Sequence, residues 1–140
     1  LALSRLNQLR SVDGIGPASG AFASTDLRYE ILRDMWDRGV KFVTGMDSGM
    51  TNANFDDFAY IPEVMVEDMG ITPMEAIISA TQVSADCLGL LDEIGTLEEG
   101  KAADVLIING NPAVDIKALH DVNTIVKQGQ IVKQENELLI

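Results

Sequence analysis

One short apolar run followed by a glycine-rich loop constrains the fold of this chain more than any other feature. Residues 40–43 suit a buried strand, and they follow Gly39, which stands where a helix would end. A helix linked this closely to a strand is typical of an α/β repeat with a parallel sheet. Asp47 then lies between Gly45 and Gly49. Because catalytic groups collect at the carboxyl ends of parallel strands, Asp47 is the leading candidate for a functional residue.

The overall composition narrows the possible partners of the chain. At 140 residues the chain has the size of one domain, and its formal net charge of −12 would repel a phosphate backbone. A single cysteine, Cys87, excludes a disulfide within the chain and fits a reducing compartment. The chain has no apolar run of membrane-spanning length, and its first residues lack the pattern of a signal peptide. We therefore expect a cytoplasmic globular protein that binds neither nucleic acid nor membrane.

Helical patterns lie on both sides of the Asp47 loop. Before the loop, a helix capped by Ser24 or Thr25 should end at Gly39. Its predicted buried stripe consists of five apolar residues, Leu27, Ile31, Leu32, Met35 and Trp36. After the loop, Pro62 suits the first turn of a helix over residues 61–69.

The next helix has the strongest start signal in the sequence. Thr72 as N-cap, Pro73 in the first turn and Glu75 at the third helical position form a capping box. The helical pattern continues to about Leu88, where Gly89 can end it. Its buried face is predicted to consist mainly of small residues, namely Ala76, Ile77, Ala80, Thr81 and Ser84. Such a face allows close packing against a sheet or another helix.

The last third of the chain changes from a helical to an extended pattern. Residues 105–108 form an apolar strand, and a short helical turn is predicted over residues 115–119. Residues 122–127 and 130–133 flank Gln128-Gly129, a pair typical of a two-residue hairpin turn. A β-unit this small is marginally stable by itself, so we expect it to pack on another part of the protein.

Several of these motifs together resemble a known family. Residues 39–49 look like the last barrel strand of the amidohydrolase superfamily, and residues 69–77 with Ala80-Thr81 resemble the helix that follows it. Residues 95–107 are similar to the family signature G-x-L-x-x-G-K-x-A-D followed by apolar residues. Shorter matches continue in the same order as far as residue 133. The most similar subgroup is that of the imidazolonepropionases and Xaa-Pro dipeptidase-like enzymes.

The resemblance implies an α/β fold with two parts. Residues 1–90 would be the carboxyl-terminal part of a (β/α)8 TIM-like barrel, comprising its last strand and flanking helices. Residues 91–140 would supply strands of a small composite β-sandwich. The implied activity is metal-dependent hydrolysis of carbon–nitrogen bonds in small cyclic amides or dipeptide-like substrates. In such enzymes an aspartate at the position of Asp47 contacts a divalent metal, here expected to be zinc, and shuttles a proton from water to the leaving nitrogen.

The sequence departs from the family pattern in its histidines. It has no H-x-H motif, His120 is its sole histidine and lies in the β-unit, and Asn52 and Asn54 stand where many relatives have a histidine. A zinc site normally takes about three or four protein ligands. We therefore expect a carboxyl-terminal fragment of a larger enzyme that is inactive in isolation. It would associate with the missing amino-terminal part or form a homo-oligomer.

Other interpretations of the same residues remain open. Asp47 could merely cap a backbone amide in its turn, and the whole chain could be a non-catalytic structural domain that self-associates through unpaired strand edges. His120 is expected to be exposed and Cys87 to be a buried small apolar residue. The acidic pairs Asp56-Asp57 and Glu98-Glu99 are expected to be solvated loop charges. Two further residues are expected to set the register of the sandwich, Lys101 and Asp104.

Overall fold

The helix predicted before the Asp47 loop is present as α2, Thr25–Asp37, in the computed structural model, which describes residues 25–46, 48–49, 54–135 and 137–139. Gly39 takes the left-handed conformation that ends the helix, with φ of +84°. The predicted cap at Ser24 lies outside the described residues.

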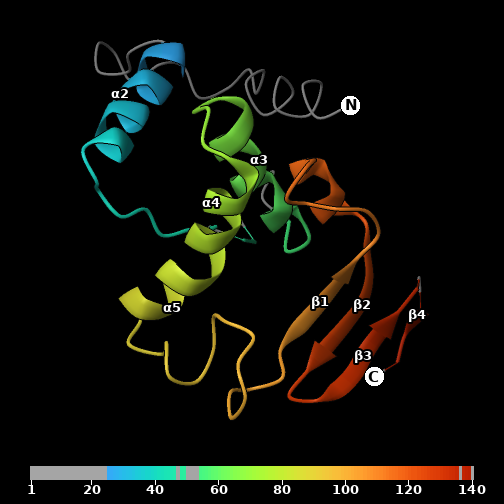
Figure 1. The fold of residues 1–140 in the computed structure, drawn as a ribbon. Coiled ribbons are helices and arrows are strands. Elements are labelled where there is room, and N and C mark those ends of the chain that lie inside the picture. The colour runs from blue at the N-terminus through green and yellow to red at the C-terminus, as the bar shows by residue number, and fades with distance from the viewer. Residues whose placement is uncertain (1–24, 47, 50–53, 136, 140) are drawn as a thin grey trace.

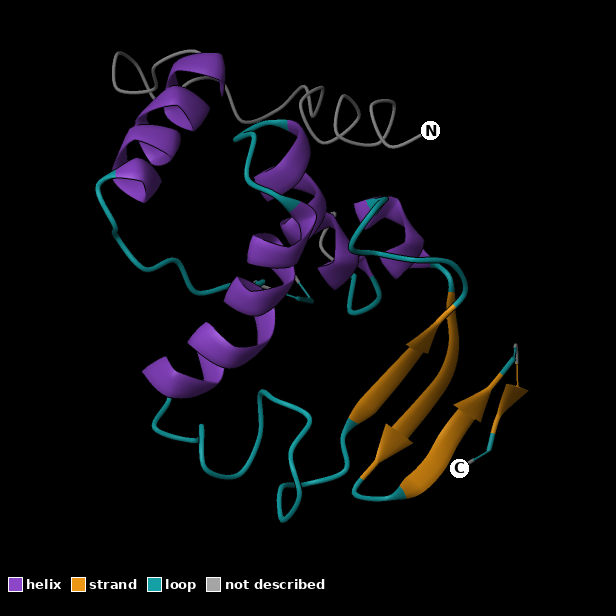
Figure 2. Ribbon diagram, in the orientation of Figure 1, coloured by secondary structure: helices purple, strands orange, loops and turns teal. Residues whose placement is uncertain are grey.

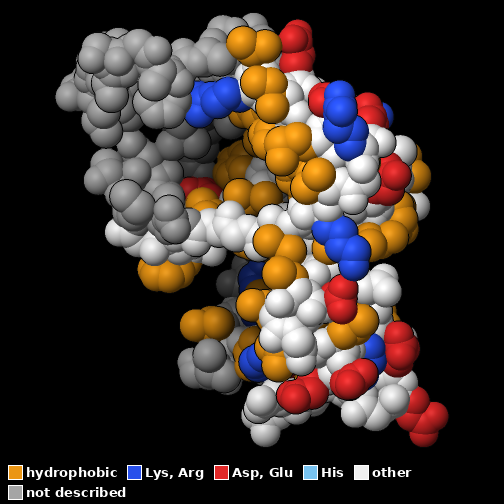
Figure 3. Space-filling model, turned by 90° about the vertical axis from the view of Figure 1, so that its left-hand side faces the viewer, with side chains coloured by type: hydrophobic (Ala, Val, Ile, Leu, Met, Phe, Trp, Pro, Cys, Tyr) orange, Lys and Arg blue, Asp and Glu red, His pale blue; other side chains and the backbone are white. Residues whose placement is uncertain are grey.

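The apolar stripe of α2 is only partly buried. Leu32 and Trp36, together with Tyr29, pack against a core of Met65, Met69, Ile71 and Ala76. The other three predicted stripe residues are exposed, namely Leu27, Ile31 and Met35. The helix therefore carries two apolar stripes, and the described residues cover one of them. Figure 3 shows the side of the molecule that faces left in Figure 1, where α2 lies, with many exposed hydrophobic side chains.

The prediction of a strand over residues 40–43 is wrong for the described structure. Residues 40–46 are extended over part of the surface without forming a ladder with any described strand. A β-strand needs a neighbouring strand to satisfy its backbone groups, and the described part of the chain places none beside this segment. All described strand pairs are antiparallel, so the parallel sheet expected from the helix–strand order is not seen here either.

The helices after the loop form a closely packed group. A 3₁₀ turn, η1 (Asp57–Ala59), leads into α3 (Tyr60–Glu67), and Pro62 lies in the first turn of α3 as predicted. Thr72 then forms the predicted capping box with Glu75 at the start of α4 (Pro73–Ile78). The two hydrogen bonds from Thr72 hold the pKa of the Glu75 carboxyl below its ordinary value.

The long predicted helix is interrupted by one wider turn. It begins as α4, continues through a single π-helical turn, η2 (Ser79–Val83), and ends as α5 (Ser84–Cys87) before Gly89. Ala76, Ser79 and Ala85 are its buried residues, whereas Thr81 is exposed. Cys87 is exposed and the prediction that it is buried is wrong, because it lies in the last turn, beyond the packed face.

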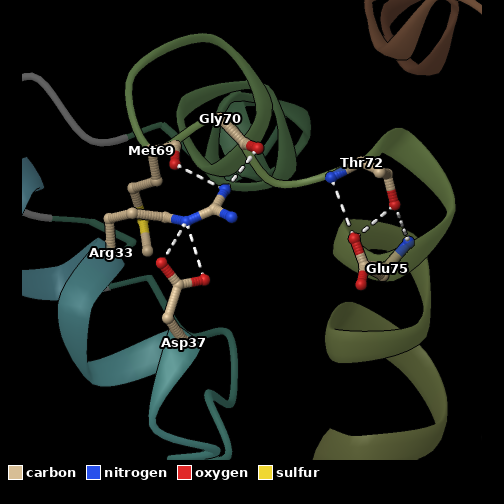
Figure 4. Close-up of polar contacts among 6 residues, drawn as sticks. All are labelled: Arg33, Asp37, Met69, Gly70, Thr72 and Glu75. Atoms are coloured by element: carbon tan, nitrogen blue, oxygen red, sulfur yellow. Dashed lines mark hydrogen bonds and ion pairs between the residues drawn. The ribbon is translucent and has the colours of Figure 1, made fainter.

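Arg33 joins α2 to the turn between α3 and α4 (Figure 4). Its Nη1 donates hydrogen bonds to the carbonyl oxygens of Met69 and Gly70, and its Nε donates to Asp37 within α2. Arg33 therefore links α2 to the turn that follows α3.

The last part of the chain is an antiparallel sheet beside the helices (Figures 1 and 2). Its strands are β1 (Val105–Ile108), β2 (Val122–Lys127), β3 (Gln130–Gln134) and β4 (Glu137–Leu138), paired in that order. The predicted turn at Gln128-Gly129 is confirmed, because both residues have positive φ, at 49° and 78°. The short β4 was not predicted.

Asp104 fixes the start of the sheet as predicted. Its carboxylate accepts hydrogen bonds from the backbone N–H of Gln128, at 2.8 Å, and from the Nζ of Lys127. These two contacts tie the residue before β1 to the β2–β3 turn. Both hydrogen bonds lower the pKa of the Asp104 carboxyl, and the bond from Lys127 has the larger effect.

No helix in the described part of the chain combines the length and apolar character that a membrane crossing requires.

Candidate functional site

The segment that leads to Asp47 is held by two serine hydroxyl groups. The Oγ of Ser79 donates to the carbonyl oxygen of Phe42 at 2.6 Å. The Oγ of Ser84 accepts from the backbone N–H of Thr44 at 3.1 Å and donates to the carbonyl oxygen of Ser79 at 2.7 Å. The ring of Phe42 also lies 5.8 Å from that of Trp36 on α2. The helical stretch formed by η2 and α5 therefore fixes the backbone just before the loop.

Asp47 itself lies outside the described residues, so its predicted role stays a prediction. The described residue Gly49 has φ of +95°, a conformation that favours glycine and suits the tight turn expected there. Among the described residues, a Cβ added to Gly49 would meet the ring of Phe55, at 3.8 Å. The positive φ at residue 49 therefore explains why the loop has a glycine there.

The described residues do not form a metal centre by themselves. Within the described ranges, no three or more His, Cys, Asp or Glu side chains lie close enough together to hold a metal ion. Asp57, one of the paired loop acids, instead accepts hydrogen bonds from the backbone and side chain of Asn54. His120, the sole histidine in the sequence, contacts Glu63 on α3. A metal at this site would need ligands from outside the described residues.

His120 and Glu63 form a pair that the sequence did not predict. Glu63 is 2% exposed, and its Oε2 lies 2.6 Å from the Nε2 of His120. The imidazole also packs on the ring of Tyr60, with centroids 4.5 Å apart. Close by, Lys117 and Glu67 form an ion pair at the surface. The two pairs join α3 to η3, Ile116–His120, and thereby join the helices to the sheet. The only sequence signal was an acidic residue within an apolar helical run.

Removing His120 should cost more stability than removing Lys117. In His120→Ala the buried Glu63 loses its partner, and we expect the free energy of unfolding to fall by about 2–3 kcal/mol. Lys117→Ala is the matched control, because it breaks the neighbouring exposed pair and should cost less than about 1 kcal/mol. Urea denaturation measures both. Equal losses in the two variants would show that burial of Glu63 does not matter.

A pocket of about 250 Å³ lies beside residues 39–42, at the start of the segment that leads to the Asp47 loop. It is lined by residues 39–42 and by Trp36, Ile78, Ser79 and Val83, most of which are apolar. Glu75 also borders the pocket, but its carboxylate is engaged by Thr72 in the capping box. The pocket therefore offers apolar surface and few free polar groups, which does not suit hydrolytic chemistry.

Comparisons with known proteins agree with the resemblance drawn from the sequence. Residues 9–132 match the model of the amidohydrolase family. An imidazolonepropionase of Brevibacillus brevis is 32% identical over 109 residues, covering 76% of this chain and 26% of that enzyme. A 5-methylthioadenosine/S-adenosylhomocysteine deaminase of Moorella thermoacetica is 30% identical over 126 residues, covering 76% of this chain and 29% of the deaminase.

Solved structures give the same result. A Xaa-Pro dipeptidase with bound methionine superposes with a TM-score of 0.66 and 33% identity, covering 74% of this chain and 25% of that one. Molinate hydrolase superposes with a TM-score of 0.69 and 26% identity, covering 75% of this chain and 26% of that one. The chain therefore spans only about a quarter of the length of these relatives.

Proposed function

Because the chain belongs to the amidohydrolase family, we propose that it forms the carboxyl-terminal part of a metal-dependent hydrolase of carbon–nitrogen bonds. The observation that carries this proposal is the match to enzymes over three quarters of the chain but only a quarter of their length. In this proposal residues 1–90 belong to a TIM-like barrel and residues 91–140 to a composite β-sandwich. The order of helices followed by an antiparallel sheet supports that division.

Asp47 is proposed as the residue that contacts the metal and moves the proton. When bound, zinc or another divalent ion would polarise the scissile bond and make water a better nucleophile. The carboxylate of Asp47 would accept a proton from the attacking water and donate it to the leaving nitrogen. The hydrogen bonds at Phe42 and Thr44 support this role, because they fix the backbone within a few residues of Asp47.

The proposed substrates are small cyclic amides or dipeptide-like molecules. The imidazolonepropionase relatives support the first class, and the Xaa-Pro dipeptidase structure supports the second. The interpretation as a non-catalytic domain rests on the missing histidine cluster in the sequence, and the relation to enzymes makes it the weaker proposal. We propose a cytoplasmic location, in keeping with a single exposed cysteine and the acidic composition.

The exposed apolar side chains support association with a further part of the protein. Leu27, Ile31 and Met35 on α2 are exposed, as are Val40 and Val43 on the segment before the Asp47 loop. In a complete barrel these positions would face neighbouring strands and helices. We propose that the remainder of the complete protein covers them, with a second copy of the chain as the alternative.

Hydrolysis by the complete protein tests the proposed function. Purified protein loaded with zinc is given imidazolonepropionate and, separately, methionyl-proline, and product release is measured. We expect one substrate to be hydrolysed at least about 100-fold faster than the other, and a chelator to abolish the reaction. Failure of the metal-loaded protein to act on either substrate class, or undiminished activity after chelation, would contradict the proposal.

A further inference from the structure

The Asn109-Gly110 pair lies where β1 ends and the chain leaves the sheet. Both residues are exposed, and they begin the connection from β1 to η3. The register of the β1–β2 ladder shifts between Ile107 and Ile108, and the ladder does not continue to residues 109 and 110. Asn109 is also the sole asparagine of the sequence that a glycine follows.

The fold requires glycine at residue 110. The φ of Gly110 is +97°, in the left-handed region, and a Cβ added there would lie 3.4 Å from the Ala118 Cβ. Because glycine has no Cβ, its backbone nitrogen is open to approach by the side chain of the preceding residue. In the described part of the chain the N–H of Gly110 donates no hydrogen bond, so no contact there competes for this nitrogen.

The reactive pair is held by contacts within the β-unit alone. The Nδ2 of Asn109 donates to the Oδ1 of Asp121 at 3.1 Å. The backbone N–H of Asn109 donates to the carbonyl oxygen of Asp121 at 2.9 Å. Asp121 directly precedes β2, so the two hydrogen bonds fasten the end of β1 to the start of β2. None of these groups belongs to the segment that leads to the Asp47 loop.

We propose that Asn109 is a site of spontaneous deamidation, a covalent modification that alters the β-unit as the protein ages. The backbone nitrogen of Gly110 gives up its proton and attacks the Cγ of Asn109. The bond from Cγ to Nδ2 then breaks, and ammonia leaves with that proton. Water opens the resulting succinimide ring at either carbonyl, which gives aspartate or isoaspartate. The site is independent of the proposed hydrolase function, because the reaction needs only water.

Either product weakens the connection between β1 and β2. Aspartate at residue 109 replaces an amide–carboxylate hydrogen bond of 3.1 Å by two facing carboxylates, and like charges this close repel each other. Isoaspartate also adds a methylene to the backbone between residues 109 and 110, which changes the path of the loop. The modification should therefore loosen the β-unit where β1 ends.

Peptide mapping of the complete protein tests the assignment. The protein is stored in mildly alkaline buffer, which favours loss of the amide proton, and is then digested with trypsin. Residues 102–117 form one tryptic peptide, which contains both Asn109 and Asn111. Fragment masses should show conversion of Asn109 to an acid, whereas Asn111 keeps its amide because Pro112 has no N–H to attack it. Asn109 that keeps its amide as fully as Asn123 inside β2 would overturn the assignment.

Asn109→Gln is the matched control for storage. Glutamine keeps an amide, but its longer side chain would have to close a larger and less favourable ring. The Tm of this variant should stay constant during storage, whereas the Tm of the parent should fall. Equal losses of Tm in the two proteins would overturn the link between the loss and Asn109.

Two further variants test the effect of the modification on the β-unit. Asn109→Asp carries one of the products from the start and should lower Tm by about 2–4 °C. Adding Asp121→Asn restores an amide–carboxylate pair with the roles exchanged, and should recover most of the shift. An unchanged Tm in Asn109→Asp would overturn the proposed loosening.

Discussion

Replacing Asp47 by asparagine in the complete protein is expected to lower kcat by about a thousandfold. Asparagine has the size of aspartate and can still donate and accept hydrogen bonds, but it cannot take up a proton from water at neutral pH. General acid–base groups contribute about 10²- to 10⁴-fold to rate, so the loss should be of that order. Steady-state kinetics should show the loss in kcat, with a much smaller change in KM.

The control for this variant is another acidic residue close by in the sequence. Asp56 is exposed and makes no capping hydrogen bond at the start of η1, so Asp56→Asn removes one negative charge without removing a proposed function. We expect it to keep parent kinetics. A kcat for Asp47→Asn within about fivefold of the parent would mean that Asp47 moves no proton in the slow step.

Gly95→Ala should destabilise the packing of residue 95 against the helix that contains Thr81 and Ala85. A Cβ at Gly95 would lie 2.5 Å from the Ala85 Cβ and 3.1 Å from the Thr81 carbonyl oxygen. Gly95 also has φ of +93°, which is unfavourable for alanine. Backbone strain and steric overlap should together lower the free energy of unfolding by about 3–4 kcal/mol. Urea denaturation of the variant and parent chains measures the loss.

The chain provides a control that separates strain from overlap. Gly100 has nearly the same φ, +91°, but a Cβ there would meet no atom of the described residues within 4 Å. Gly100→Ala should therefore cost only about 1–2 kcal/mol. Adding Ala85→Gly to Gly95→Ala should recover part of the loss, because it removes the closest overlapping atom. Equal losses in the two glycine variants would show that Gly95 does not pack against the helix as described.

The sequence predicted the features that depend on a few neighbouring residues. The capping box of Thr72 and Glu75, the left-handed Gly39 and the hairpin turn at Gln128-Gly129 are all confirmed. Each of these features depends on a few neighbouring residues, so a short sequence pattern is enough to predict it. The family resemblance is confirmed for the same kind of reason, because an ordered set of short motifs is specific even where each motif is not.

The features that the sequence did not predict depend on distant partners. Glu63 and His120 are 57 positions apart, and nothing near either residue identifies the other. The π-helical turn that aligns Ser79 with Ser84 leaves no pattern that a regular helix would not also show. The exposed apolar stripe of α2 was wrongly predicted to be buried. An apolar helical pattern shows that a face can be covered, but it does not show which element covers it. Residues 40–43 read as a strand, but a strand forms only beside another strand.

The proposed function places Asp47 in the metal site of a carbon–nitrogen hydrolase. A crystal structure of the complete protein grown with zinc, with the metal located by its anomalous scattering, would show whether Asp47 contacts the ion. We expect a carboxylate oxygen of Asp47 within about 2.5 Å of the ion, with histidines from outside the described residues as the other ligands. A zinc ion bound elsewhere, with Asp47 turned into a backbone cap of its own loop, would contradict the claim.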